Sequence, residues 1–232
     1  MEAERLMNTV VKQASQSETL HLIARVRTDF SVGTGVFPLD LNLAVRMEAW
    51  YRSPQWRFEA FYESGQWVSV VVESSDYIHV LSPDGRWTRR RSPIGVRFEE
   101  IKLKLLGLDL FKAVTYISLS DALWNGQPVW EVKGQGVDGS MVTWLIDKDN
   151  LVVRKFERRG GFFEFEHEGE KKRVPLPVAT VLEFEVVEFP AEVPSELFEV
   201  PPDAPVEEAA TDKLLGLFEQ WLARGHTNNC ES

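Results

Sequence analysis

The side chains that could do chemistry are few and scattered in this sequence. The four histidines are His21, His79, His167 and His226, and no two of them stand at a ligand spacing. His79 alternates with apolar neighbours, which is typical of a histidine on a strand surface or in a core. His167 is followed by Glu168 but not by a second histidine, so a zinc-protease motif is excluded. We therefore expect no metal site.

Two acidic patterns also have simple structural explanations. The stretch DKDN at 147–150 resembles the start of a calcium loop, but it lacks the glycine and the distant glutamate of such a loop. A turn between strands explains it better. Glu183 and Glu185 share one face of an alternating strand, as solvent-facing residues do. Because a hydrolase elbow, a phosphate loop and a dinucleotide motif are absent as well, we expect no catalytic residues, no cofactor and no enzyme activity.

Net charge and composition exclude further classes of function. The chain has 232 residues and a formal net charge of −10, which argues against a nucleic-acid surface, because phosphate binding needs a basic field. The run Arg89 to Arg91 could contact anionic headgroups, although a solvated turn explains it too. The single cysteine, Cys230, has no partner for an intrachain disulfide. No stretch of about 18 apolar residues predicts a membrane span.

The first part of the chain predicts a helix followed by antiparallel strands. From Thr19 onward, apolar and polar residues alternate, as in a half-buried strand. Gly33, Gly35 and Pro38 predict a loop after this first strand. Before it, residues 3–15 carry an apolar stripe at helical spacing, formed by Leu6, Met7, Val10, Val11 and Ala14.

The later part contains a second helical segment and more strands. Residues 97–112 predict a helix that is broken near Gly107. Strands then resume, with a strong two-residue hairpin signal in the Asn-Gly pair at 125–126. A long alternating strand covers 178–189, and a last helix is predicted over 211–225.

About ten strands and three helices, without βαβ alternation, predict an α+β fold that is mostly an antiparallel sheet. We expect one domain over 1–206, followed by a helix and a polar tail over 207–232. A sheet of this size has more apolar face than two or three helices can cover. It either closes into a solidly packed sandwich or barrel, or curls into a half-barrel whose concave side holds an apolar ligand.

The apolar positions of the alternating strands are the candidate ligand-binding residues. An acyl chain would bind to them by burial alone, at about 0.8 kcal/mol per CH₂ group, and would need no catalytic residue. The candidate residues are Leu22, Ala24, Val26, Val45, Met47, Trp56, Phe58, Val70, Val72, Trp130, Val142, Trp144, Ile146, Phe163, Phe165, Leu182, Phe184 and Val186.

The order of these parts resembles the bacterial lipoprotein-carrier (LolA-like) superfamily of the cell envelope. The resemblance is carried by NGQPVWEVKGQG at 125–136, by VTWLIDKDNLVVRKFE at 142–157, and by a closing P-x-x-L-F-x-V-P-P-D-A-P-V at 194–206. It covers most of residues 1–206. The superfamily includes periplasmic lipoprotein carriers, lipid-binding lipoproteins and sensors that regulate anti-sigma factors.

The resemblance implies a curved half-barrel closed by helices, with lipid or lipoprotein acyl groups on its concave side. It implies a monomeric, non-catalytic carrier outside the cytoplasm, whose signal sequence has been removed, although the residues alone also allow a cytosolic protein. The alternative is an envelope-stress sensor that binds a membrane protein. Carriers have an arginine inside the barrel; Arg46 is the nearest by position, but it points opposite Val45 and Met47, so that role is not transferred.

The proline-rich segment at 193–206 predicts how the sheet ends. Pro190 and Pro194 stop the long strand, because proline provides no hydrogen-bond donor. Leu197 and Phe198 are expected to pack on the apolar face as a short edge element. The segment would then end the curved sheet and hold its last strand in place.

Overall fold

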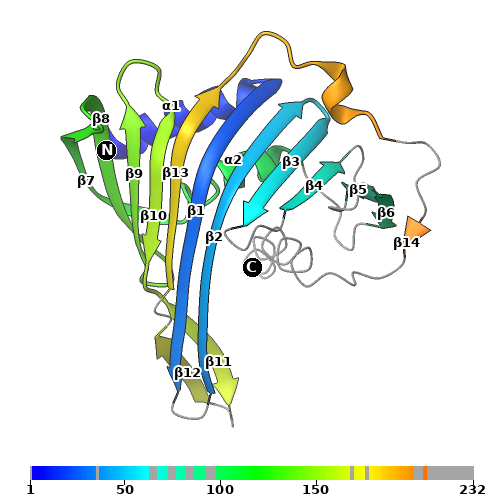
Figure 1. Ribbon diagram of the computed structural model, residues 1–232. Helices are drawn as coiled ribbons and strands as arrows, with labels where there is room; N and C mark the ends of the chain where they lie inside the picture. Colours follow the sequence, from blue (N-terminus) through cyan, green and yellow to red (C-terminus); the bar gives the residue numbers. More distant parts are fainter. Residues whose placement is uncertain are drawn as a thin grey trace.

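The computed structural model describes residues 2–34, 37–62, 67–72, 77–81, 86–91, 98–167, 170–175, 178–200 and 206–207 (Figure 1). Its elements are α1 (Glu2–Gln16), β1 (Thr19–Thr34), β2 (Phe37–Arg52), β3 (Gln55–Tyr62), β4 (Trp67–Val72), β5 (Tyr77–Leu81), β6 (Trp87–Arg91), α2 (Phe98–Leu105), β7 (Val114–Trp124), β8 (Gln127–Gly136), β9 (Met141–Asp147), β10 (Val153–Arg159), β11 (Phe162–His167), β12 (Glu170–Pro175), β13 (Val178–Glu188), the 3₁₀ helix η1 (Ser195–Phe198) and β14 (Val206–Glu207). The helix predicted over 211–225 lies outside the described residues.

One large sheet dominates the fold. Its twelve strands follow the order β14-β6-β5-β4-β3-β2-β1-β13-β10-β9-β8-β7, and every neighbouring pair is antiparallel except β14 and β6. The strands bend along their length, and α1 and α2 both lie on the same side of the sheet, behind it in Figure 1. The predicted mostly antiparallel α+β class, with a curved sheet and helices on one face, is confirmed.

Helix α1 covers the sheet with the stripe that its sequence predicts. Met7 has no exposed surface, and the other apolar residues of its inner side are buried as well: Ala3, Val10, Val11 and Ala14. Glu2 and Glu4 stand in the first turn, where carboxylates interact favourably with the helix dipole. The helix therefore needs the sheet to bury its apolar side, and the sheet needs the helix for the same reason.

Helix α2 is shorter than predicted and ends where the sequence indicates a break. Leu105 is its last residue, and Gly107 follows with a φ of +65°, a left-handed conformation that favours glycine. The N–H of Leu108 donates to the carbonyl of Leu103 at 2.7 Å, which satisfies an end carbonyl of the helix. Leu105, Leu106 and Leu108 then enter the core fully buried.

Tight turns connect the strands on the β7 side of the sheet. Asn125 and Gly126 have φ values of 50° and 81°, as a two-residue hairpin of type I′ requires, so the hairpin predicted there is confirmed. Residues 147–152 close the β9–β10 hairpin, also as predicted. The Asp147 N–H donates to the carbonyl of Val152 at 2.9 Å.

The loop predicted around Gly33 and Pro38 is wrong, because both strands continue through it. Thr34 pairs with Phe37, so only residues 35–36 separate β1 from β2. Pro38 is tolerated in β2 because, among the described residues, β3 pairs with β2 only from Val45 onward, so that Pro38 interrupts no described ladder on that side.

A bulge in β13 changes which valine of this strand faces the core. Ala24 pairs with Phe184 but Ile23 pairs with Val186, and the register shift between them leaves Glu185 unpaired. The extra residue reverses the alternation, so Val187 is buried in the core in place of Val186. The prediction that Val186 belongs to the inner apolar face, which assumed strict alternation along 182–186, is therefore wrong.

The strand that contains Phe163 and Phe165 is not part of the large sheet. β11 pairs only with β12 and forms a separate two-stranded sheet, with Phe163 opposite Val174 and Phe165 opposite Lys172. These two candidates were expected in one continuous sheet with the others, and this expectation is wrong. Local alternation looks the same in either sheet, because it does not depend on which strand is the partner.

Segment 193–200 packs on the opposite face from the one predicted. Phe198 and Val193 are buried and form a small cluster with Trp50, Trp87, Leu197 and Val200, separate from the main core. Arg57, which faces the same way as Trp50, donates from Nη1 to the carbonyl of Leu197 at 2.9 Å. The segment is therefore a 3₁₀ turn on the outer side of β2 and β3, and not an edge element on the apolar face.

Candidate functional site

The inner face of the large sheet, toward α1 and α2, gathers most of the candidate ligand-binding residues. Those with 5% exposure or less, all members of one core, are Leu22, Ala24, Met47, Trp56, Phe58, Val142, Trp144, Ile146, Leu182 and Phe184. Val26, Val45 and Trp130 are partly buried against the same core. The side chains of Val70, Val72, Phe163 and Phe165 lie outside the described ones. The sequence thus brings residues from six strands of one sheet onto a single apolar face.

Aromatic rings line one part of this inner face. Trp56 has no exposed surface and stacks on Phe58, with ring centroids 5.2 Å apart and planes 9° from parallel. The ring centroid of Tyr51, which pairs with Trp56 across β2 and β3, lies 4.5 Å from that of Trp56. Such close ring pairs add to the stability that burial provides and fix the orientation of the rings.

A second buried tryptophan joins α2 to the sheet. Trp144 donates from Nε1 to the carbonyl oxygen of Gly107 at 2.7 Å, and both partners are buried. Phe156, the partner of Trp144 on β10, lies directly under Gly107, where a Cβ would approach the Phe156 Cβ to 2.7 Å. Gly107 therefore both ends α2 and permits its contact with the sheet.

One charged side chain is buried within the apolar interior. Lys102 of α2 is 1% exposed, and its Nζ donates to the carbonyls of Ser15 at 3.2 Å and Ser17 at 2.7 Å. These carbonyls stand at the end of α1, where a cation interacts favourably with the helix dipole. The same Nζ lies 5.0 Å from the centroid of the Tyr51 ring. Lys102 thus connects α2, the end of α1 and strand β2.

Apart from this lysine, one hydrogen bond within the described residues links a side chain of α1 to another element. Gln13 donates from Nε2 to the carbonyl of Asn150 at 3.0 Å, at an exposed position. The helix is otherwise held by its apolar stripe. Its separation from the sheet would expose apolar surface but break few hydrogen bonds.

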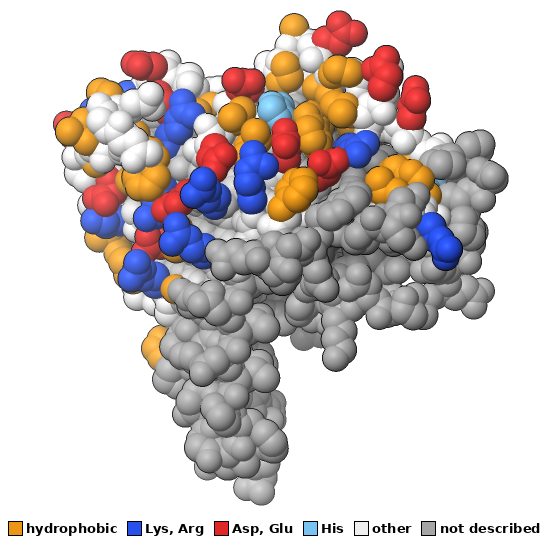
Figure 2. Space-filling view, viewed as in Figure 1, with side chains coloured by type: hydrophobic (Ala, Val, Ile, Leu, Met, Phe, Trp, Pro, Cys, Tyr) orange, Lys and Arg blue, Asp and Glu red, His pale blue; other side chains and the backbone are white. Residues whose placement is uncertain are grey.

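The described part of the outer face carries charged side chains of both signs, with hydrophobic side chains among them (Figure 2). Arg25 donates to Glu185 at 2.7 Å, Arg27 donates to Glu183 at 3.2 Å, and Arg46 lies 3.8 Å from Glu185. These cross-strand pairs show that both glutamates are solvent-facing, as the sequence indicated. Arg46 is likewise on the outer face, which agrees with its expected direction.

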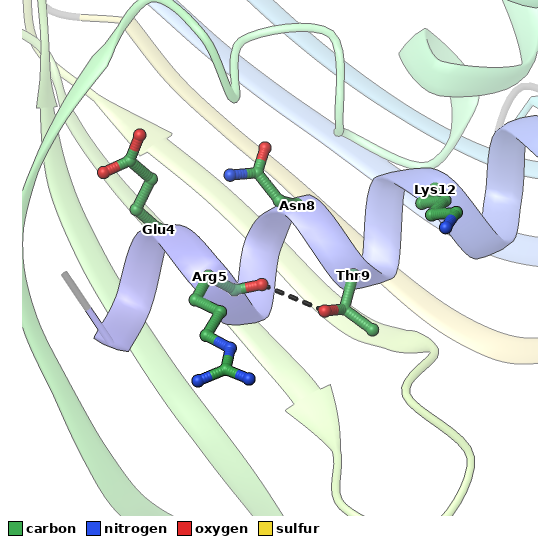
Figure 3. A pocket seen from close by; sticks show the side chains of 5 residues that line it. All are labelled: Glu4, Arg5, Asn8, Thr9 and Lys12. Atoms are coloured by element: carbon green, nitrogen blue, oxygen red, sulfur yellow. Dashed lines mark hydrogen bonds between the residues drawn. The ribbon is translucent and has the colours of Figure 1, made fainter.

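Two shallow depressions lie along the outward side of α1. The first has a volume of about 440 Å³ and is lined by Glu4, Arg5, Asn8, Thr9 and Lys12, whose side chains come from one helix (Figure 3). The second, of about 500 Å³, is lined by Thr9, Lys12, Gln13, Gln16, Ser17 and Phe189. Thr9 donates to the carbonyl of Arg5 at 3.0 Å within the helix. These depressions are the polar outer surface of α1 and contain none of the candidate residues.

The DKDN turn has a structural role in the hairpin. Asp147 accepts two hydrogen bonds from Arg154, at 2.9 and 2.8 Å, and one each from the N–H groups of Asp149 and Asn150. Burial alone would raise the pKa of Asp147, but these hydrogen bonds outweigh it and hold the pKa below its ordinary value of 3.8. In the described part of the chain, no group of three or more His, Cys, Asp or Glu residues could hold a metal ion.

Sequence reasoning missed three structural features of this interior. Tyr51 was not named as part of the apolar face, although it alternates with Met47 and Ala49. Lys102 was not singled out, because a lysine in an amphipathic helix normally faces solvent. The hydrogen bond from Trp144 to Gly107 joins residues 37 positions apart, and no local pattern indicates it.

Comparisons with known proteins concern the fold. No protein-family profile and no curated protein matches the chain. Among solved structures, the lipoprotein LppX of Mycobacterium tuberculosis is 14% identical, with 83% of this chain and 98% of that chain covered and a TM-score of 0.48. A LolA superfamily protein from Nitrosomonas europaea is 10% identical over 83% and 97%, with a TM-score of 0.32. MucB in the Pseudomonas aeruginosa MucA/MucB complex is 12% identical over 90% and 65%, with a TM-score of 0.45. Proteins of the group that the sequence resembles are thus among the structurally similar ones.

Proposed function

We propose that this chain is a non-catalytic binding or carrier protein that works outside the cytoplasm and holds lipid or lipoprotein acyl chains on the inner face of its sheet. The observation that carries this proposal is the apolar interior between a curved sheet and two helices. Thirty hydrophobic residues of the described part of the chain form one continuous buried core there. An interior of that kind provides the burial that an acyl chain needs.

Binding would require α1 and α2 to move away from the sheet. In the described part of the chain, the interior is closed by the helices, and its largest side chains are fully buried, including Trp56, Trp144 and Phe58. Among the described residues, α1 and the residue that follows it make few hydrogen bonds to other elements: one from the Gln13 side chain, and those that the carbonyls of Ser15 and Ser17 accept from Lys102. An acyl chain that replaces the helix stripe would recover the lost burial at about 0.8 kcal/mol per CH₂ group.

Across the described residues, no helix has both the length and the hydrophobicity to span a bilayer. A lipid carrier of the envelope has to move its cargo between membranes through water, so a shielded interior is what the task requires. Location outside the cytoplasm is part of the proposal and is tested by fractionation of cells that express the native gene.

One observation favours a protein partner as a second candidate function. β7 stands at the end of the strand order among the described strands, and it exposes Ile117 and Leu123 at 59% and 73%. An edge strand with exposed apolar side chains can pair with a strand of another chain. A sensor domain that binds a membrane-bound protein would use such a surface. Pull-down from envelope extracts with an I117K/L123K variant as control tests this alternative.

Native mass spectrometry of the purified protein is the direct test of the carrier function. We expect adducts with the masses of lipids, and uptake of a fluorescent fatty acid that unlabelled palmitate displaces. Ala24 is fully buried on the inner face, so A24F should reduce both signals by filling the interior. Ala122 lies in β7 outside the core, and A122F is the matched control. A wild-type protein that carries no lipid and takes up no probe would exclude the carrier function.

A further inference from the structure

The two fully buried tryptophans of the inner face differ in how their indole N–H groups are used. Trp144 donates to the carbonyl of Gly107 at 2.7 Å. The Nε1 of Trp56 is equally inaccessible, but it has no hydrogen-bond partner among the residues that the structure describes. A buried donor that lacks an acceptor has lost its hydration without replacement, which is rare in folded proteins and marks a position to be explained.

The surroundings of Trp56 hold its ring in place. The ring stacks on Phe58 at 5.2 Å and contacts Tyr51 at 4.5 Å, so the indole is packed between two aromatic side chains. A ring fixed in this way cannot readily turn its N–H toward an acceptor elsewhere in the protein. Any acceptor must instead come to the N–H.

A buried positive charge also lies close to the Tyr51 ring. The Nζ of Lys102 is 5.0 Å from the centroid of the Tyr51 ring and belongs to a side chain that is 1% exposed. Trp56 and Lys102 are therefore both buried next to the Tyr51 ring, in an interior that is otherwise apolar. Both groups favour an oxygen that carries negative or partial negative charge.

We propose that the indole N–H of Trp56 donates a hydrogen bond to the polar end of the ligand, an ester or carboxyl oxygen at the head of an acyl chain. This inference rests on the proposed function and specifies its ligand class as acyl compounds with an acceptor oxygen, in preference to plain hydrocarbons. The head lies beside Tyr51 and Lys102, and the chain extends over the apolar inner face.

The hydroxyl of Thr88, the other described inner-face group without a hydrogen-bond partner, belongs to a different place. It stands on β6, three strands from β3, which corresponds to about 14 Å at the usual spacing of strands. One acceptor oxygen cannot serve both groups. The head-group position is therefore assigned to Trp56 alone.

The test compares two ligands of similar length in the same protein. Displacement of a bound fluorescent fatty acid gives inhibition constants for methyl palmitate and hexadecane, and their ratio within one variant cancels the affinity of the probe. W56F and W144F both replace a buried indole of the inner face with a smaller phenyl ring. Only W56F removes the N–H that lacks a partner. W144F thus controls for the lost volume.

We expect the wild type and W144F to prefer methyl palmitate by about three- to tenfold, the contribution of one hydrogen bond, and W56F to show a ratio near one. A W56F protein that keeps the wild-type ratio overturns the inference and leaves the carrier function intact. A wild-type protein from which neither ligand displaces any probe, or that takes up no probe, overturns the carrier function itself.

The wild-type chain offers a second measurement that does not depend on the folding of a variant. The indole N–H signals of the tryptophans are resolved by ¹H–¹⁵N NMR and are assigned by through-bond correlation experiments. Titration with methyl palmitate should move the Trp56 indole proton downfield, as a new hydrogen bond does, and hexadecane should not. An indole signal that responds equally to both ligands contradicts the proposed contact.

Discussion

Trp144 and Gly107 are joined by a buried hydrogen bond of 2.7 Å, from the indole Nε1 of β9 to the carbonyl oxygen that follows α2. The bond fixes the end of the helix against strand β9. Because Gly107 also lies against Phe156, hydrogen bonding and close packing act on the same residue. A movement of α2 away from the sheet would break this bond or would have to carry Trp144 with it.

Replacement of Trp144 by phenylalanine should destabilise the protein. The W144F variant leaves the buried carbonyl of Gly107 without its donor, which costs about 1–3 kcal/mol, in addition to the cavity left by the smaller ring. Urea unfolding followed by circular dichroism measures the change. W124F serves as control, because Trp124 belongs to the edge strand β7 and lies outside the core. Equal midpoints for the two variants would contradict the importance of this bond.

Two glycines with similar backbone conformation allow packing to be separated from backbone strain. Gly107 and Gly126 have φ values of +65° and +81°, but a Cβ at Gly107 meets Phe156 whereas one at Gly126 meets nothing within 4 Å. G126A should therefore cost only the left-handed conformation, about 1–2 kcal/mol. G107A should cost more, because Phe156 must also move. Similar unfolding free energies for the two variants would show that the site relaxes without cost.

Stability should fall in acid through Asp147. The pKa of this carboxyl is below 3.8 in the folded protein. Its contribution to the free energy of unfolding is therefore complete above the unfolded pKa near 3.8, and it is lost as the pH falls through the folded pKa. D147N should lower the unfolding free energy at pH 7 by roughly 1.5–3 kcal/mol, the range for hydrogen bonds to charged groups. It should also flatten the decrease of stability below pH 4.

The control for this effect is D149N, which changes a carboxyl in the same turn. Asp149 contributes its backbone N–H to Asp147, and this N–H remains in the variant. Thermal unfolding between pH 2 and pH 7 compares the three proteins. If D147N and the wild type show parallel pH profiles, Asp147 does not carry the acid sensitivity.

Lys102 should control how firmly the end of α1 is held. K102M keeps the apolar length of the side chain but removes the donor to the carbonyls of Ser15 and Ser17. We expect faster hydrogen exchange in α1, and faster uptake of a fluorescent fatty acid, because separation of the helix from the sheet becomes less costly. K104M, on the same helix, is the control. Unchanged exchange in α1 would show that its apolar stripe alone holds the helix.

Local patterns in the sequence were sufficient for much of the fold. The stripe of α1, the hairpin at 125–126, the turn at 147–150 and the long strand β13 follow from spacing and turn chemistry, which act over a few residues. The apolar inner face follows from the same alternation, and ten of its 18 proposed residues have 5% exposure or less. The sequence could predict these features because each depends on neighbours along the chain.

Tertiary structure alone decided the remaining features. The bulge that replaces Val186 with Val187, the separate sheet of Phe163 and Phe165, and the outer position of Phe198 depend on which strands become partners. The same holds for the indole of Trp56, which sequence can only describe as apolar. Whether its N–H has an acceptor depends on groups that are distant in the chain. The periodicity of neighbouring residues carries no information about such distant partners.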